Sequence, residues 1–134
     1  IIRHEVSDMS GFDTVEHLLS GSGLARLHQA RTGHVCKPEE VADATGGAET
    51  QAIMARALGA LVREVAYLSP PEGGIYFNGS LARTLLTPET TDLVLAPLQN
   101  DSAFEGRMAR MPMYLLTDDA SALHGCARYL SVHI

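Results

Sequence analysis

Three small groups of residues in this sequence have the types and spacing needed for chemistry. Glu16 precedes the Ser-Gly-Ser-Gly stretch at Ser20–Gly23, Gly79 follows a run of strand-forming residues, and Asp118–Asp119 is a pair of adjacent carboxylates. A carboxylate accepts short, strong hydrogen bonds from hydroxyl groups, so Glu16 could hold a sugar. Glycine lets a backbone approach a phosphate or a ribose closely, so Ser20–Gly23 and Gly79 could line a nucleotide or sugar site.

Each group also has a structural interpretation, which the local pattern alone favours for most of them. Ser20–Gly23 is not a Walker loop, because no lysine follows it and no strand precedes it, and a helix corner is the simpler explanation. Asp13 and Glu16 have the spacing of a capping box. Asp118–Asp119 has the position of a helix cap. For Gly79, a plain turn and a ligand-binding turn at the end of a strand are equally compatible with the sequence.

The elements that must position these groups begin with two short helices. Asp13 or Thr14 can cap a helix that contains Glu16, and Ser20–Gly23 is expected to break it. Helical spacing resumes from Leu24 to about Arg31.

The longest helix is predicted over about 48–68. Its apolar residues recur at helical spacing and predict a buried stripe, which consists of Met54, Leu58, Leu61, Val65 and Leu68.

The second half of the sequence alternates between helices and strands. Short strands are predicted at 75–77 and 112–116. Helices are expected over about 81–86, from Thr87 to about Gln99, and from Asp118 or Asp119 to about Leu130, with a polar loop or broken helix over 100–110. This pattern predicts an α/β fold with parallel strands and crossover helices. Because two strands are few for a sheet, we expect the sheet to continue in residues outside this chain.

Composition limits the function classes. The chain has 134 residues, 46% hydrophobic and 19% charged, with a net charge of -6 and a single lysine. The absence of a basic cluster argues against a nucleic-acid partner, and no apolar run has the length of a membrane span. The two cysteines and the spacing of the histidines indicate neither a disulfide framework nor a metal site, and a reducing cytoplasm is the expected location.

Three segments resemble the bacterial glucokinase family. Residues 16–24 (EHLLSGSGL) are similar to that family's E-R-V-L-S-G-P-G-L segment. Residues 73–83 (GGIYFNGSLAR) resemble its G-G-V-F-I-A-G-G-I-x-P-R segment, and 112–127 resembles its closing P-V-Y-L-I strand and small-residue helix. The segments follow the family's order over nearly the whole chain.

The resemblance implies an actin-like, ribonuclease-H-like ATPase fold in two lobes, of which residues 1–134 would be the carboxyl-terminal lobe. It implies ATP-dependent phosphorylation of glucose, or of a related hexose, with Mg²⁺ accompanying ATP, and a homodimer. Glu16 would contact the sugar hydroxyls. The implied cofactor-binding residues are Ser20, Gly21 and Gly23, which shape the loop beneath the sugar, and Gly79, which faces the nucleotide.

The chain departs from the family at several positions. Ser22 stands where the family usually has proline, and Asn78, Ser80 and Ala82 also differ from the family's residues, so the changes concentrate in the nucleotide turn.

The family's phosphate-binding glycine segment, its Asn-Asp pair and its E-x-G-H sugar segment are absent from this chain. No catalytic residue is therefore assigned, and the chain is expected to be inactive alone. The alternatives are a non-catalytic sugar sensor and a degenerate scaffold on the same fold.

Overall fold

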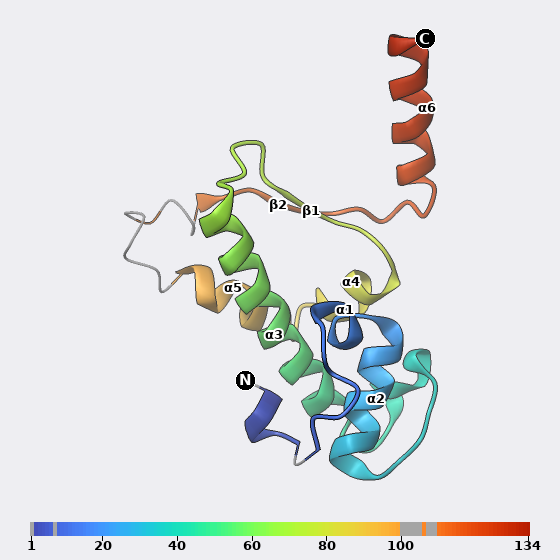
Figure 1. Ribbon diagram of the computed structural model, residues 1–134, viewed down its shortest axis with the longest axis vertical. Helices are drawn as coiled ribbons and strands as arrows, with labels where there is room; N and C mark the ends of the chain where they lie inside the picture. The colour runs from blue at the N-terminus through green and yellow to red at the C-terminus, as the bar shows by residue number, and fades with distance from the viewer. Residues whose placement is uncertain (1, 7, 100–105, 107–109) are drawn as a thin grey trace.

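The computed structural model describes residues 2–6, 8–99, 106 and 110–134, and shows a mixed α/β chain that is mostly helical (Figure 1). Its elements in chain order are η1 (Ile2–His4), α1 (Val15–Leu18), α2 (Gly21–Thr32), η2 (Pro38–Asp43), α3 (Gly47–Leu68), β1 (Ile75–Phe77), α4 (Ser80–Leu85), α5 (Thr91–Gln99), β2 (Met113–Leu115) and α6 (Ser121–His133).

The α1–α2 corner differs from the expected helix break. Helix α2 begins at Gly21, not at Leu24, so both glycines of the Ser-Gly-Ser-Gly stretch lie inside its first turn. The break between the helices is only Leu19 and Ser20. Because Ser20 caps α2 with its side chain, the helix can start directly after α1.

Helix α3 is the longest helix and packs against α2, η2, α4 and α5. Its bounds match the predicted helix closely. The predicted buried stripe is wrong in its second half: Met54 is fully buried, but Val65 is 48% and Leu68 86% exposed. The buried face instead runs through small residues such as Gly59 and Ala66. Helix α5 packs closely against this face, so small side chains are needed where apolar periodicity alone pointed to large ones.

Strands β1 and β2 form a two-stranded parallel sheet, as predicted, with Tyr76 opposite Tyr114. One face of the sheet packs against the end of α3, where Ile75 and Phe77 join a cluster around Val62. Tyr76 and Tyr114 stack on each other at 4.8 Å between ring centroids on the other face, where both are exposed.

The crossover from β1 to β2 runs through α4 and α5. The strand–turn–helix connection at Asn78-Gly79 is confirmed, since α4 begins at Ser80. Helix α5 begins at Thr91, four residues later than expected, because Thr90 is buried and its hydroxyl donates to the Leu85 carbonyl at 2.7 Å. Most of the segment expected to be a polar loop over 100–110 lies outside the described residues.

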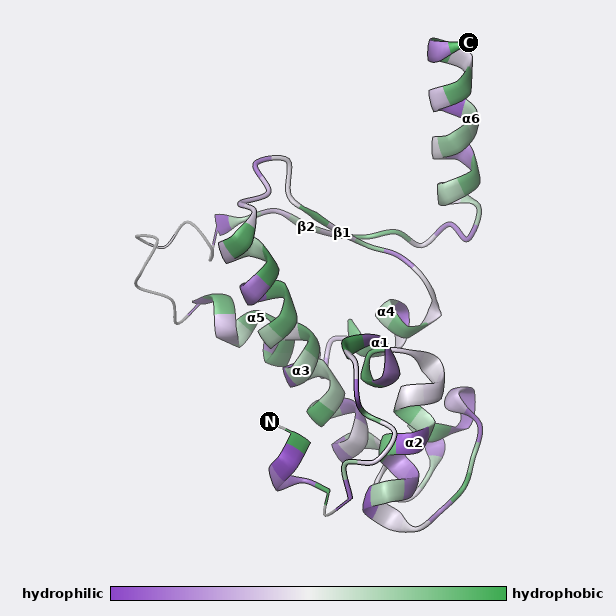
Figure 2. Ribbon diagram, in the orientation of Figure 1, coloured by the Kyte–Doolittle hydropathy of each residue, from purple (hydrophilic) through white to green (hydrophobic). Residues whose placement is uncertain are grey.

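Helix α6 projects away from the other elements (Figure 1), and none of its residues is buried. Figure 2 shows apolar residues along it, although it is exposed; the exposed apolar side chains include Leu123, Leu130 and Val132. Among the described residues, no helix is long and apolar enough to span a bilayer.

Candidate functional site

Glu16 lies in the first turn of α1, and its side chain is exposed. Of the two predicted caps, Thr14 is the one used: its hydroxyl accepts a hydrogen bond from the His17 N–H at 3.1 Å. Glu16 is therefore the second residue of the helix, whereas a capping box needs the carboxylate at the third. Within the described part of the chain Glu16 has no hydrogen bond or ion pair, so the capping interpretation is wrong and the carboxylate is free to bind a ligand.

The Ser20–Gly23 stretch forms the corner between α1 and α2. The Ser20 hydroxyl accepts from the Gly23 N–H at 3.1 Å and lies 3.2 Å from the Ser22 hydroxyl. A Cβ atom on Gly23 would lie 1.9 Å from the Leu18 carbonyl oxygen, whereas one on Gly21 would meet only ordinary contacts at 3.6 Å. Ser20 and Gly23 thus fix the angle between α1 and α2. At position 21 the structure has room for a side chain, so glycine is not needed there for steric reasons.

Gly79 lies at the carboxyl end of β1 and precedes α4. Its φ of 98° is in the region that favours glycine, and an added Cβ would meet no atom within 4 Å. The Gly79 N–H is held by the Asn78 side-chain oxygen at 2.8 Å. The turn therefore needs glycine for its backbone conformation, and the space above it is open.

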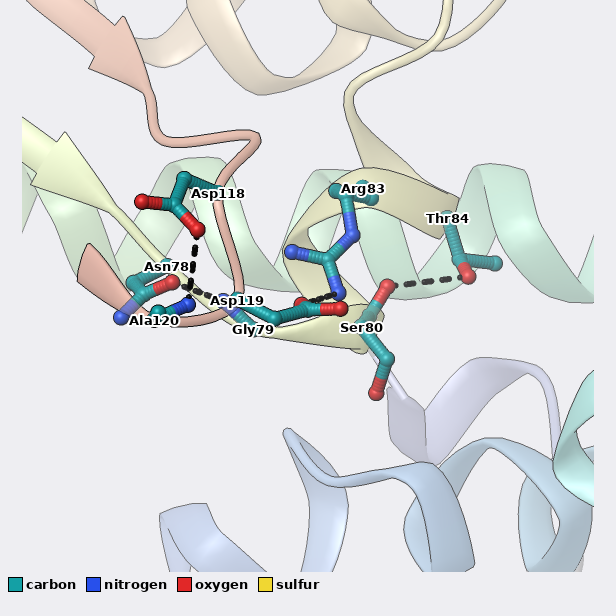
Figure 3. A network of polar contacts seen from close by, with 8 residues as sticks. All are labelled: Asn78, Gly79, Ser80, Arg83, Thr84, Asp118, Asp119 and Ala120. Carbon is teal, nitrogen blue, oxygen red and sulfur yellow. Dashed lines mark hydrogen bonds and ion pairs between the residues drawn. The ribbon is translucent and has the colours of Figure 1, made fainter. Parts of the chain in front are cut away.

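The carboxyl ends of the two parallel strands bring a second loop beside this turn (Figure 3). Arg83 of α4 pairs with Asp119, and their nitrogen and oxygen atoms are 2.5 Å apart. Asp118 accepts from the Ala120 N–H at 2.9 Å and lies 3.2 Å from the His124 ring. The capping prediction is wrong for both carboxylates, because the residue before α6 is Ala120 and no side chain caps the helix. Asp118 closes a turn ahead of α6, and Asp119 links this loop to α4.

One apolar cluster places the α1–α2 corner and α4 on the same support. Leu24 of α2 and Leu85 of α4 are both buried in this cluster, and Leu18, Leu19 and Leu81 pack against it. The elements that carry Glu16 and Gly79 are thus brought onto a common core.

A groove of about 420 Å³ lies on the other side of α2, between that helix and residues 35–38. Its lining includes Ser22, Arg26 and Lys37. It contains neither Glu16 nor Gly79, so it does not correspond to the predicted sugar or nucleotide position.

His28 is a buried titratable group that joins α2 to α3. Its Nδ1 atom lies 3.1 Å from the Thr50 hydroxyl, which also bonds to the Gly46 carbonyl and receives a hydrogen bond from Arg31. The opposite ring nitrogen, Nε2, is buried and has no hydrogen-bond partner among the described residues. Burial, with smaller contributions from the charges of His34 and Arg31, lowers the pKa of the His28 imidazole.

The described residues contain no group of three or more His, Cys, Asp or Glu side chains that could hold a metal ion. Sequence reasoning did not identify Arg26 and Arg83, whose partners come from other segments. The sequence carries no signal for those pairings, because arginine spacing does not reveal contacts with a distant carbonyl or carboxylate.

Comparison with known proteins adds a family match. The glucokinase family model matches residues 2–133. The glucokinase of Cupriavidus metallidurans strain CH34 is 31% identical over 142 residues, which cover 92% of this chain and 41% of that protein. The glucokinases of Chelativorans sp. strain BNC1 and Neisseria meningitidis are each 25% identical, over 85% and 92% of this chain and 37% and 42% of their own lengths. The chain therefore spans about two fifths of these relatives, and no solved structure matches it significantly.

Proposed function

Because this chain belongs to the glucokinase family, we propose that it is part of an enzyme that transfers a phosphoryl group from ATP to glucose and yields glucose 6-phosphate. The observation that carries the proposal is the position of Glu16. Glu16 lies in the segment that resembles the family's sugar-contacting segment. Its carboxylate is exposed beside the close-packed corner of α1 and α2, and it has no hydrogen-bond or ion-pair partner in the described structure.

In this proposal Glu16 accepts hydrogen bonds from sugar hydroxyls. Ionised carboxylates make short, strong bonds to hydroxyl donors, and such bonds orient the sugar for attack on the phosphoryl group. Ser20 and Gly23 support this role indirectly, because they set the angle at which α1 leaves α2. A related hexose with the same hydroxyl arrangement would be held in the same way.

Gly79 would face the nucleotide. The open space above the Gly79 backbone and its position at the carboxyl end of a parallel strand are compatible with the approach of ATP, since ligands of α/β sheets bind at this edge. ATP would supply the phosphoryl group, and Mg²⁺ would come with its phosphates. The described residues of this chain offer no metal cage of their own, which fits an ion held mainly by substrate phosphates and water.

The chain would form the carboxyl-terminal lobe of an actin-like, two-lobed kinase. Phosphoryl transfer depends on several positioning and charge-stabilising parts acting together, and this chain lacks the family's Asn-Asp pair, whose aspartate serves as the base. We therefore propose that the 134-residue chain is inactive without the rest of the enzyme. The two free cysteines are compatible with a cytoplasmic location, and the family resemblance supports a homodimer.

The test is calorimetry on the full-length protein with glucose and with ATP, followed by an assay for glucose 6-phosphate. The kinase proposal predicts binding of both ligands and product formation by the full-length protein, but no product from residues 1–134 alone. Binding of glucose without ATP would instead indicate a sugar sensor, and binding of neither would indicate a scaffold.

A further inference from the structure

Helix α1 is too short and too exposed to be held in place by its own residues. It is four residues long, and none of those residues is buried. A helix this short is not stable by itself, so contacts from outside α1 must hold it in place. The orientation of Glu16 depends on those contacts.

Arg26 of α2 supplies contacts on both sides of Glu16. Its Nη1 atom donates to the Gly11 carbonyl at 2.7 Å and to the His17 carbonyl at 3.2 Å. Its guanidinium also lies over the Phe12 ring, 5.8 Å from the ring centroid. The Arg26 side chain therefore contacts both the segment before α1 and the end of α1.

Gly11 is fitted to the Arg26 side chain. A Cβ atom on Gly11 would lie 3.1 Å from the Arg26 Cδ atom, and Gly11 has a φ of 83°. The absence of a side chain at Gly11 thus leaves room for the arginine stem to pass over the backbone. A side chain at Gly11 would therefore crowd Arg26 in addition to straining the backbone.

The chemistry of arginine suits this task. Its guanidinium stays charged, and a single nitrogen, Nη1, donates to both carbonyl oxygens. The His17 carbonyl is near the end of α1, where the helix dipole favours a positive charge. Lysine could supply the charge and donors, but it has no planar group to lie over the Phe12 ring.

We propose that Arg26 is a positioning residue for Glu16, and thereby for the sugar hydroxyls that Glu16 binds. The inference rests on the proposed function. Arg26 does not touch the sugar in this account. It acts by keeping the 11–18 segment, and with it the carboxylate, in one place.

The experiment is steady-state kinetics on the full-length protein with Arg26→Gln, Arg26→Lys, Glu16→Gln and the double variant Glu16→Gln/Arg26→Gln. Arg63→Gln is the matched control, because Arg63 is a surface arginine that pairs, among the described residues, with its neighbour Glu64. Displacing a binding group by a fraction of an ångström has large effects on reactivity. We expect Arg26→Gln to raise the glucose KM roughly tenfold, on the basis of that sensitivity, with the ATP KM unchanged.

The conservative and double variants separate positioning from stability. Arg26→Lys should restore part of the glucose affinity, and it also serves if Arg26→Gln does not fold. In the Glu16→Gln background, Arg26→Gln should add almost nothing to the glucose KM, because the group being positioned has already lost its charge.

Three results would overturn the proposal. The first is a normal glucose KM in both Arg26 variants while Glu16→Gln raises it. The second is a full additional effect of Arg26→Gln in the double variant. The third is a Glu16→Gln variant with unchanged glucose KM, which would also remove the proposed role of Glu16 and is thus distinguishable from a failure of Arg26 alone.

Discussion

Gly23 and Leu18 are in direct backbone contact at the corner of α1 and α2, where a Cβ on Gly23 would lie 1.9 Å from the Leu18 carbonyl oxygen. No side chain fits there without movement of the backbone. The Ser-Gly-Ser-Gly stretch is therefore a close-packed helix corner. In the proposed function, this corner orients Glu16 toward the sugar.

Replacing Gly23 with alanine should destabilise the protein. The added methyl group must displace the end of α1, and overpacking of this kind typically costs about 1–3 kcal/mol. Urea unfolding of the full-length protein measures the loss. Gly21→Ala is the control, since its methyl group meets only ordinary contacts with Pro38, and we expect it to be neutral or slightly stabilising. Equal stability of the two variants would contradict the close-packed corner.

His28 should make stability depend on pH below neutrality. The Thr50 hydroxyl donates to the Gly46 carbonyl, so the Nδ1 atom of His28 must be the donor to Thr50. Nε2 is then unprotonated and has no partner among the described residues. Protonating it would bury an unpaired N–H, and the charges of His34 and Arg31 oppose it further.

Because the pKa of His28 is lowered in the folded state, the free energy of unfolding should decrease as the pH falls. The unfolded chain takes up the proton first as the pH falls, so the stabilisation is complete above the ordinary pKa of 6.5 and decreases below it. One proton contributes at most about 1.4 kcal/mol per pH unit. Several exposed titratable groups on the elements packed against α2 bond to neither ring nitrogen; they include Glu16, His17, Glu39, Glu40, Asp43, Glu49 and Glu64.

Urea unfolding at pH 7.5 and 5.5 measures this dependence. His28→Gln removes the titrating group and should flatten the curve between these values, even if it lowers stability overall. An equally steep curve in the variant would show that His28 does not control the acid response.

The elements near the candidate site could be predicted where local signals decide them. The strand at Ile75–Phe77 and its Asn78-Gly79 turn into a helix follow from β-forming residues and turn chemistry, and the structure has both. The start of α2 was predicted three residues too late, because glycine is a poor helix former. The Ser20 cap and the contact of Gly23 with Leu18 explain why both glycines lie inside the first turn.

The buried stripe of α3 was predicted only in part for a related reason. The apolar periodicity correctly predicted that Met54 is buried. It also predicted that Leu68 is buried, whereas Leu68 is exposed. Which face of a helix is covered depends on its partners, and here Gly59 packs on the backbone of Val94, with a Cβ-to-oxygen distance of only 2.4 Å if alanine replaced it. Tertiary contacts of this kind leave no periodic signal.

Gly79→Ala should affect nucleotide binding more than sugar binding. A φ of 98° strains any residue with a side chain, at about 1–3 kcal/mol, and relaxing that strain would move the turn proposed to face ATP. We expect a higher ATP KM, a nearly unchanged glucose KM and lower stability, measured by steady-state kinetics and thermal unfolding. Gly73→Ala, which has open space and no positive φ, is the control. A Gly79→Ala variant with normal ATP KM would argue against the nucleotide role.

The most direct test of the account is the glucose KM of full-length Glu16→Gln, compared with Glu39→Gln, an exposed glutamate in the first turn of η2. Glutamine keeps the shape of the side chain but removes the charge that strengthens bonds to hydroxyls, a difference of roughly 1–2 kcal/mol per bond or about tenfold in affinity. The account predicts that Glu16→Gln raises the glucose KM by about tenfold or more and leaves thermal stability unchanged, while Glu39→Gln changes neither. A normal glucose KM in Glu16→Gln would contradict the central claim that this carboxylate holds the sugar.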